Sequence, residues 1–96
     1  IEIKEINGDK VKITGEYTTL ITCHEDQPGT VAKVSGICHE RDINIAFMQL
    51  VRSQKGQGAT MTLELDGQVN PDLTEAIKKV PGVSRVILIN PLGGNA

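Results

Sequence analysis

Aromatic residues are almost absent from this sequence. Tyr17 and Phe47 are the only two in 96 residues, and there is no tryptophan. The core must therefore be built from aliphatic side chains and methionine, and the 39% hydrophobic content is enough for one domain. A chain with two aromatics and a net charge of −2 lacks the stacking platform and the basic stripe of a nucleic-acid surface. We expect no nucleic-acid partner.

Long hydrophobic runs are lacking as well. No apolar run approaches the roughly 20 residues that a membrane-spanning helix needs. We expect no signal peptide before the domain. We therefore expect no membrane association and a cytoplasmic location.

Cysteine is scarce, but each copy is followed by a histidine: Cys23-His24 and Cys38-His39. Structural zinc sites usually place paired ligands two to four residues apart, and that spacing is missing here. Neighbouring residues on a strand also point to opposite faces, which separates Cys23 from His24. We predict no metal site, and two buried, reduced cysteines.

The first 16 residues read as a β-hairpin. Apolar and charged residues alternate on both sides of Asn7-Gly8, and Asn-Gly is a strong signal for a two-residue hairpin turn. We predict a β-hairpin extension over residues 1–16, a compact domain over residues 17–90 and a flexible tail over residues 91–96. A hairpin alone is marginal in water, so it must pack on the domain or on another partner.

The rest of the chain alternates between the two kinds of periodicity. Strands are predicted over residues 18–24, 43–53, 59–65 and 83–89, with helices over 28–40 and from Asn70-Pro71 to about Val80. The order strand, helix, strand, strand, helix, strand favours an α+β, ferredoxin-like βαββαβ fold: a four-stranded antiparallel sheet with two helices on one face. The other face should be wet or covered by a partner. The side chains expected in the core are Ile21, Cys23, Val31, Val34, Ile37, Ile43, Ile45, Phe47, Ile77 and Val80.

The loop after the first of these strands is the candidate binding site. Pro28-Gly29 opens the helix, and the first backbone N–H groups of a helix have no partner within it. Together with the helix dipole they form a small anion site that suits an amino-acid carboxylate. The N–H groups are those of Gly29, Thr30 and Val31, beside His24 and Asp26. The same pattern occurs in proteins that bind nothing there, and Asp26 could simply cap the helix.

Four segments together resemble an ACT domain, the small regulatory domain that binds amino acids in enzymes of amino-acid metabolism. They are His-Glu-Asp-Gln-Pro-Gly-Thr-Val (24–31), Asp-Ile-Asn-Ile-Ala (42–46), Gly-Ala-Thr-Met-Thr-Leu-Glu-Leu-Asp (58–66) and Val-Pro-Gly-Val (80–83). The region before residue 17 resembles the segment that precedes the ACT domain in the β subunit of bacterial iron–sulfur L-serine dehydratases. The tail domain of D-3-phosphoglycerate dehydrogenases is a close cousin.

The resemblance implies where a ligand binds. In serine-binding ACT domains the effector lies at a dimer interface, held by the loop after the first strand and by an Asn at the start of the second. The matching residues here are His24, Asp26 and Asn44. L-serine is the ligand expected. Because an antiparallel sheet of this size has open edges that need covering, we predict an edge-to-edge homodimer with Gly36 and the first helix near the two-fold axis. Gln27 stands where Arg is frequent in the family, so the loop itself carries no cation.

The resemblance also implies what this domain does not do. The catalytic iron–sulfur cluster of a dehydratase is expected in another subunit or domain of the parent enzyme, and no cofactor and no catalytic residue are expected here. The dehydratase would deaminate L-serine to pyruvate and ammonia. Two alternatives stay open: the regulatory domain of a phosphoglycerate dehydrogenase, and an ACT fold used only for subunit contact. A small enzyme in its own right is disfavoured, because no nucleophile lies beside His24 and Asp26 in the loop.

Overall fold

A computed structural model describes residues 2–6, 9–13, 16–27, 29–52, 58–66 and 69–89, the first two ranges by their backbone alone. The elements are β1 (Glu2–Ile6), β2 (Asp9–Ile13), β3 (Thr18–Glu25), α1 (Thr30–Glu40), β4 (Ile45–Arg52), β5 (Gly58–Leu65), α2 (Asp72–Lys78) and β6 (Val83–Ile89). No helix among them is long and apolar enough to cross a membrane. The predicted turn Asn7-Gly8 and the predicted tail 91–96 lie outside the described residues.

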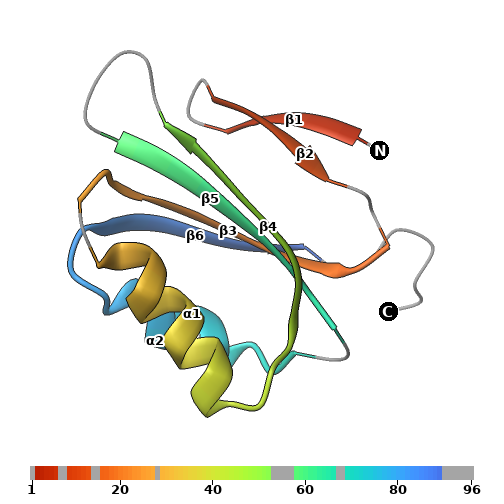
Figure 1. Cartoon of the computed structure of the whole chain (residues 1–96), viewed down its shortest axis with the longest axis vertical. Coiled ribbons are helices and arrows are strands. Elements are labelled where there is room, and N and C mark those ends of the chain that lie inside the picture. Colours follow the sequence, from red (N-terminus) through yellow and green to blue (C-terminus); the bar gives the residue numbers. More distant parts are fainter. Residues whose placement is uncertain are drawn as a thin grey trace.

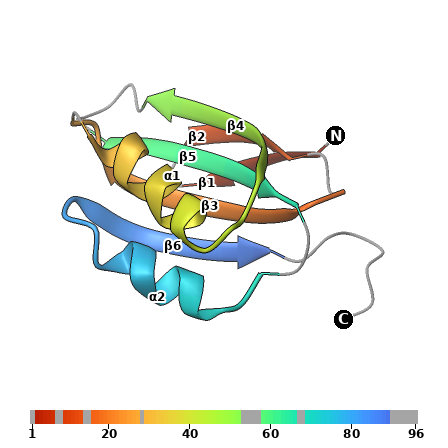
Figure 2. The same ribbon diagram turned by 60° about the horizontal axis from the view of Figure 1, so that its bottom comes forward.

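The main sheet has the strand order β4-β5-β3-β6, and every pair is antiparallel. Both helices lie on one face of it (Figure 1). Figure 2 shows α1 and α2 in front of the sheet and the ribbon of β1 and β2 behind it. The ferredoxin-like arrangement predicted from the sequence is confirmed, and β4 and β6 are its two edge strands.

Aliphatic side chains fill the space between the sheet and the helices, as the scarcity of aromatics requires. The fully buried members of this core are Leu20, Val34, Cys38, Met61, Leu63, Leu65, Leu73 and Ile77. Val31, Ile37, Ile43 and Ile45 pack against it while partly exposed. Of the residues predicted to be buried, Ile21, Cys23, Val34, Ile77 and Val80 are so.

The prediction that Phe47 is buried with Ile43 and Ile45 is wrong. Phe47 is 54% exposed, and the reason is a bulge in β4. Ile45 pairs with Leu65, but Phe47 pairs with Glu64, so two steps along β4 match one step along β5. A bulge of this kind inserts one extra residue and reverses the alternation that follows. Ile45 therefore faces the helices, while Phe47 faces the other side of the sheet.

The face of the sheet away from the helices is less open than its sequence suggests. Thr60, Thr62 and Glu64 of β5 point to this face, yet they are only 1%, 2% and 5% exposed. The ribbon packs over this face, because β2 contacts β4 and β5. The two strands of the hairpin predicted for residues 1–16 thus pack on the main sheet.

The end of α1 orients the chain toward β4. Asp42 adopts a left-handed conformation, with φ of 59°, immediately after the C-cap residue Arg41. Its N–H donates to the His39 carbonyl at 3.0 Å, and the Ile43 N–H donates to the Cys38 carbonyl at 2.9 Å. This pair of bonds is the Schellman arrangement that closes helices. Asn44 therefore lies immediately before the first residue of β4.

Candidate functional site

Three residues form a row across the helix-facing side of the sheet. The register pairs His24 of β3 with Ala59 of β5, and Ala59 in turn with Arg52 of β4. Directly paired residues of antiparallel strands point to the same face. His24 and Arg52 therefore flank Ala59, whose side chain is a single methyl group. In the adjacent row the middle position is Met61, which fills the space.

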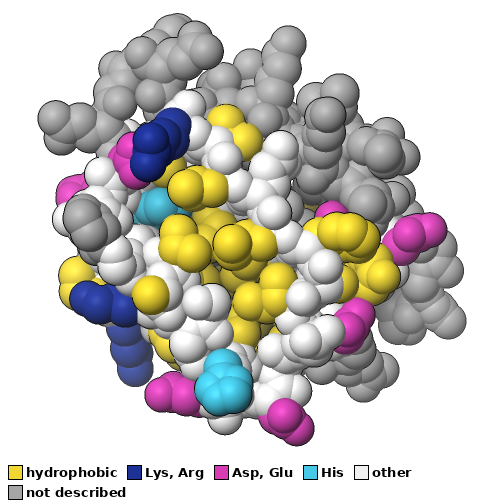
Figure 3. Space-filling model, viewed as in Figure 1, with side chains coloured by type: hydrophobic (Ala, Val, Ile, Leu, Met, Phe, Trp, Pro, Cys, Tyr) yellow, Lys and Arg dark blue, Asp and Glu magenta, His cyan; other side chains and the backbone are white. Residues whose placement is uncertain are grey.

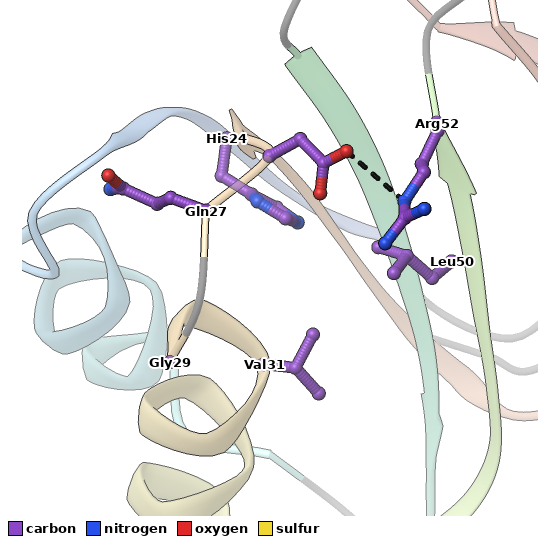
Figure 4. Close-up of a pocket in the computed structure, with 7 residues that line it drawn as sticks. His24, Gln27, Gly29, Val31, Leu50 and Arg52 are labelled. Atoms are coloured by element: carbon purple, nitrogen blue, oxygen red, sulfur yellow. Dashed lines mark ion pairs between the residues drawn. The ribbon is translucent and has the colours of Figure 1, made fainter.

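A pocket of about 380 Å³ opens at this end of the sheet, beneath the start of α1. This size is at the lower end of the range for small-molecule sites. It is lined by His24, Asp26, Gln27, Gly29, Val31, Leu50 and Arg52. Figure 4 shows the side chains of His24, Val31, Leu50 and Arg52 around one space, with Val31 and Leu50 as its apolar wall.

His24 lines this pocket and has a buried ring nitrogen that is unsatisfied. The residue is only 4% exposed. Its Nδ1 lies 2.8 Å from the Glu25 carbonyl oxygen. A carbonyl only accepts, so Nδ1 carries the hydrogen and, in the neutral ring, Nε2 is an acceptor. Nε2 is buried, and none of the described residues offers it a partner. A buried polar atom without a partner is costly and points to a donor supplied by a ligand or by water.

Asp26 does not cap α1. No side chain caps this helix, and the N-cap residue is Gly29. The Asp26 carboxylate instead pairs with the Arg52 guanidinium, with 3.1 Å between Oδ2 and Nε (Figure 4). The Arg52 side chain is 73% exposed and that of Asp26 is 33% exposed. The pair brings one positive and one negative charge into the pocket.

The loop that carries Asp26 is attached to the turn before β6. The Glu25 N–H donates to the Gly82 carbonyl at 2.9 Å. Gly82 has φ of +92°, and the Gln27 side-chain amide occupies the space that a Cβ there would need. In Figure 4 the Gln27 side chain points away from His24 and Arg52. Gln27 therefore supports the loop.

The predicted helix end is present in part. Gly29 and Val31 line the pocket, and Gly29 has φ of +90°, a conformation that glycine adopts without strain. Thr30 is 3% exposed and its side chain does not line the pocket. The start of α1, which is the positive end of its dipole, borders the pocket through Gly29 and Val31.

Asn44 lies at the opposite end of β4 from Arg52, and so outside the pocket of its own chain. Its Nδ2 donates to the Asp66 carboxylate at 2.7 Å, and the Asp66 N–H donates to the Asn44 carbonyl at 3.0 Å. One chain alone thus brings together His24, Asp26, Gly29 and Val31, but not Asn44.

The sequence interpretation missed Arg52 and Leu50. The loop has no cation of its own, and the structure supplies one from a strand more than twenty residues away. The strand register, which pairs Arg52 with Ala59, places it there. The strand ends predicted from the sequence, residues 53 and 59, would instead have paired Arg52 with Thr60, so no local signal identifies Arg52.

The cysteines lie on opposite sides of the sheet. Cys38 belongs to the helix-side core, whereas Cys23 alternates with Leu20 and contacts the Thr60 hydroxyl on the other face, at 4.0 Å. Burial raises the pKa of the Cys38 thiol, and the Arg41 guanidinium lowers it by less. The described residues contain no group of three or more His, Cys, Asp or Glu that could hold a metal ion.

The edge strand β4 carries the large exposed hydrophobic side chains. Phe47 is 54% exposed, Met48 52% and Leu50 39%. Figure 3 shows hydrophobic side chains gathered across the middle of this view. Edge strands offer unpaired backbone groups, and proteins usually cover or blunt them. An apolar edge beside the pocket is suited to contact with another protein surface.

Comparisons with known proteins relate this chain to one family of domains. The sequence profile of the ACT domain matches residues 17–82. The chain is 32% identical over 89 residues to a probable L-serine dehydratase β chain of Bacillus subtilis, covering 93% of this chain and 40% of that protein. It is 36% identical over 88 residues to a D-3-phosphoglycerate dehydrogenase of Methanocaldococcus jannaschii, covering 92% of this chain and 17% of that protein.

A solved structure shares the fold. The ACT domain of a GTP pyrophosphokinase of Chlorobium tepidum superposes with a TM-score of 0.59 at 25% identity, covering 75% of this chain and 95% of that one. The chain spans less than half of the length of the two curated relatives described above.

Proposed function

The chain belongs to the ACT family of regulatory domains, and from this premise we propose that it binds a small amino acid and thereby regulates a cytoplasmic enzyme of serine metabolism. L-serine is the proposed ligand. The observation that carries the proposal is the buried, unpartnered His24 Nε2 in a pocket that also contains Asp26 and the start of α1. A ring-nitrogen acceptor, an anion and a helix N-terminus are complementary to a hydroxyl, an ammonium and a carboxylate.

The working unit of this proposal is a homodimer formed through the β4 edge. Antiparallel pairing of two β4 strands about a two-fold axis would continue the sheet and cover Phe47, Met48 and Leu50. Gly36 of α1 would lie near the axis. Within its own chain, a Cβ added at Gly36 would meet nothing within 4 Å, which leaves room for a second helix to approach.

Such a dimer also explains why Asn44 lies away from the pocket in one chain. β4 runs from Ile45 to Arg52, so antiparallel pairing puts the start of one β4 beside the end of the other. The pocket at Arg52 would then face Asn44 of the partner subunit. One Asn44 N–H is used by Asp66, which leaves the second N–H and the amide oxygen to orient the ligand.

Titration calorimetry of L-serine into the protein and into the Asn44→Ala variant tests this function. The variant should fold, because Asn44 is exposed. Binding should weaken by ~1–3 kcal/mol, the scale of a lost hydrogen bond that leaves a desolvated group unpaired. Asp66→Ala is the matched control, since it breaks the same intrachain bond but keeps the amide.

One result would remove the partner's Asn44 from the site, and another would overturn the proposed function itself. If binding is unchanged in Asn44→Ala, the partner's amide is not part of the site. If the unmodified protein gives no heat with serine or other small amino acids at millimolar concentration, the ACT fold serves subunit contact alone. Sedimentation is the companion experiment, and a purely monomeric protein at tens of micromolar, an order-of-magnitude level for a modest interface, would remove the dimer.

For the parent enzyme we propose an iron–sulfur L-serine dehydratase, with the cluster and catalysis in a separate subunit or domain. The likeness to the dehydratase β chain supports this assignment, because it spans 93% of the present chain and 40% of that protein. The phosphoglycerate dehydrogenase is the second candidate, given its 36% identity. The sequence that adjoins Ile1 in the gene decides between them, because a nucleotide-binding dehydrogenase domain there would reject the dehydratase.

A further inference from the structure

The two charged residues that line the pocket are paired with each other. Asp26 and Arg52 meet at 3.1 Å, and among the residues that the structure describes no other Asp, Glu, Lys or Arg lines the pocket. The pocket therefore has no net charge but has a fixed polarity: a cation on the β4 side and an anion on the loop side. A zwitterion, which has one negative and one positive group, is complementary to this arrangement of charges.

We infer that the Asp26–Arg52 ion pair opens to bind the head group of a zwitterionic amino acid, with the ligand carboxylate on the Arg52 guanidinium and the ligand ammonium on Asp26. This inference rests on the proposed function and extends it. It makes Arg52 the specificity-determining residue for the carboxylate.

The helix N-terminus alone is a weaker seat for a carboxylate than Arg52. A helix end carries the equivalent of roughly half a positive charge. An arginine carries a full charge and a planar fork of donors that matches a carboxylate in two parallel bonds. A carboxylate in this pocket also meets the negative charge of Asp26, which only Arg52 can balance among the pocket residues.

The free energy lost when the Asp26–Arg52 pair opens is small, and contacts with the ligand offset it. Arg52 is 73% exposed, and exposed ion pairs contribute little net stability because water and salt screen them. On exchange, each member regains a charged partner from the ligand. His24 Nε2 gains as well, because the ligand ammonium or hydroxyl donates to an acceptor that otherwise has no partner among the described residues.

If ligand groups replace the Asp26–Arg52 contact, only ligands that carry both charges should bind well. A carboxylic acid without an amino group leaves Asp26 unpaired, and an amine without a carboxylate leaves Arg52 unpaired. Val31 and Leu50 close the pocket on its apolar side and favour a short side chain. The class is therefore small α-amino acids in their zwitterionic form.

The test compares L-serine with L-serinamide, which lacks the carboxylate charge, by titration calorimetry on the full chain and on Arg52→Gln. The unmodified protein should prefer serine by about tenfold or more, the scale of one charged hydrogen-bonded contact. Arg52→Gln should reduce that preference to within about threefold of unity, and Arg52→Lys should retain part of it. Arg41→Gln is the matched control, because Arg41 also forms an ion pair, with Asp72 at 2.9 Å, but does not line the pocket.

A second arm tests the other half of the exchange. Asp26→Asn should weaken serinamide but not 3-hydroxypropionate, which is serine without its amino group. If Arg52→Gln binds serine and keeps the full preference over serinamide, the carboxylate binds elsewhere; the inference then fails and the proposed function stands. If no small amino acid binds the unmodified protein, both fail together. Circular dichroism of each variant separates a binding loss from unfolding.

Discussion

Gly82→Ala should destabilise the protein through two separate effects at one position. Gly82 has φ of +92°, and a Cβ there would run into the Gln27 side-chain amide. Its carbonyl accepts the Glu25 N–H at 2.9 Å, so the turn before β6 supports the pocket loop. The substitution thus tests both the backbone conformation and the position of Gln27.

The magnitude follows from the separate contributions. A left-handed conformation costs an L-residue ~1–2 kcal/mol, displacing Gln27 from its rotamer costs ~0.5–1.5 kcal/mol, and the loss of glycine freedom in the unfolded chain returns ~0.4–1 kcal/mol. The expected net loss is about 2 kcal/mol. Gly29→Ala is the matched control, because Gly29 has φ of +90° but nothing within 4 Å of its Cβ position. Without a collision, its net loss should be about 1 kcal/mol.

Urea unfolding of four proteins measures the Gln27 contribution: the unmodified chain, Gly82→Ala, Gln27→Ala and the double variant. Gln27→Ala removes the colliding amide, so Gly82→Ala should cost about 1 kcal/mol less in that background. Equal costs in both backgrounds would show that Gln27 does not pack on Gly82. A neutral Gly82→Ala together with a neutral Gly29→Ala would refute the positive φ angles themselves.

Two further predictions concern the pocket and the core. Ala59→Leu fills the middle of the row between His24 and Arg52, so it should abolish detectable serine binding in calorimetry. Overpacking should also lower the free energy of unfolding in urea by ~1–3 kcal/mol. Serine binding at full affinity would show that the row does not shape the site. Burial raises the pKa of the Cys38 thiol. Above the unfolded-state pKa of about 8.5, the unfolded chain loses its proton first. The free energy of unfolding should therefore fall as pH rises from there through the folded pKa. Denaturant unfolding at several alkaline pH values should show a shallower fall in Cys38→Ala, and identical slopes would contradict the buried thiol.

The sequence alone determined the order and type of the elements. Apolar alternation in residues 59–65 and helical spacing of Val34 and Cys38 are local patterns, because side-chain direction follows directly from strand and helix geometry. The pocket loop was also readable, since His24, Asp26, Gly29 and Val31 are close in the chain and share a strand end and a helix start. Contiguity is what made this half of the site predictable.

Only the tertiary structure decided where the other half of the pocket comes from. Arg52 reaches Asp26 because β5 lies between β3 and β4 and its register aligns His24, Ala59 and Arg52. Phe47 is exposed because a single bulge shifts the register of β4 against β5. Pairing between strands depends on hydrogen bonds across the sheet, and one inserted residue moves every later side chain to the other face. The hydrophobic periodicity of the sequence does not reveal that shift in strand register.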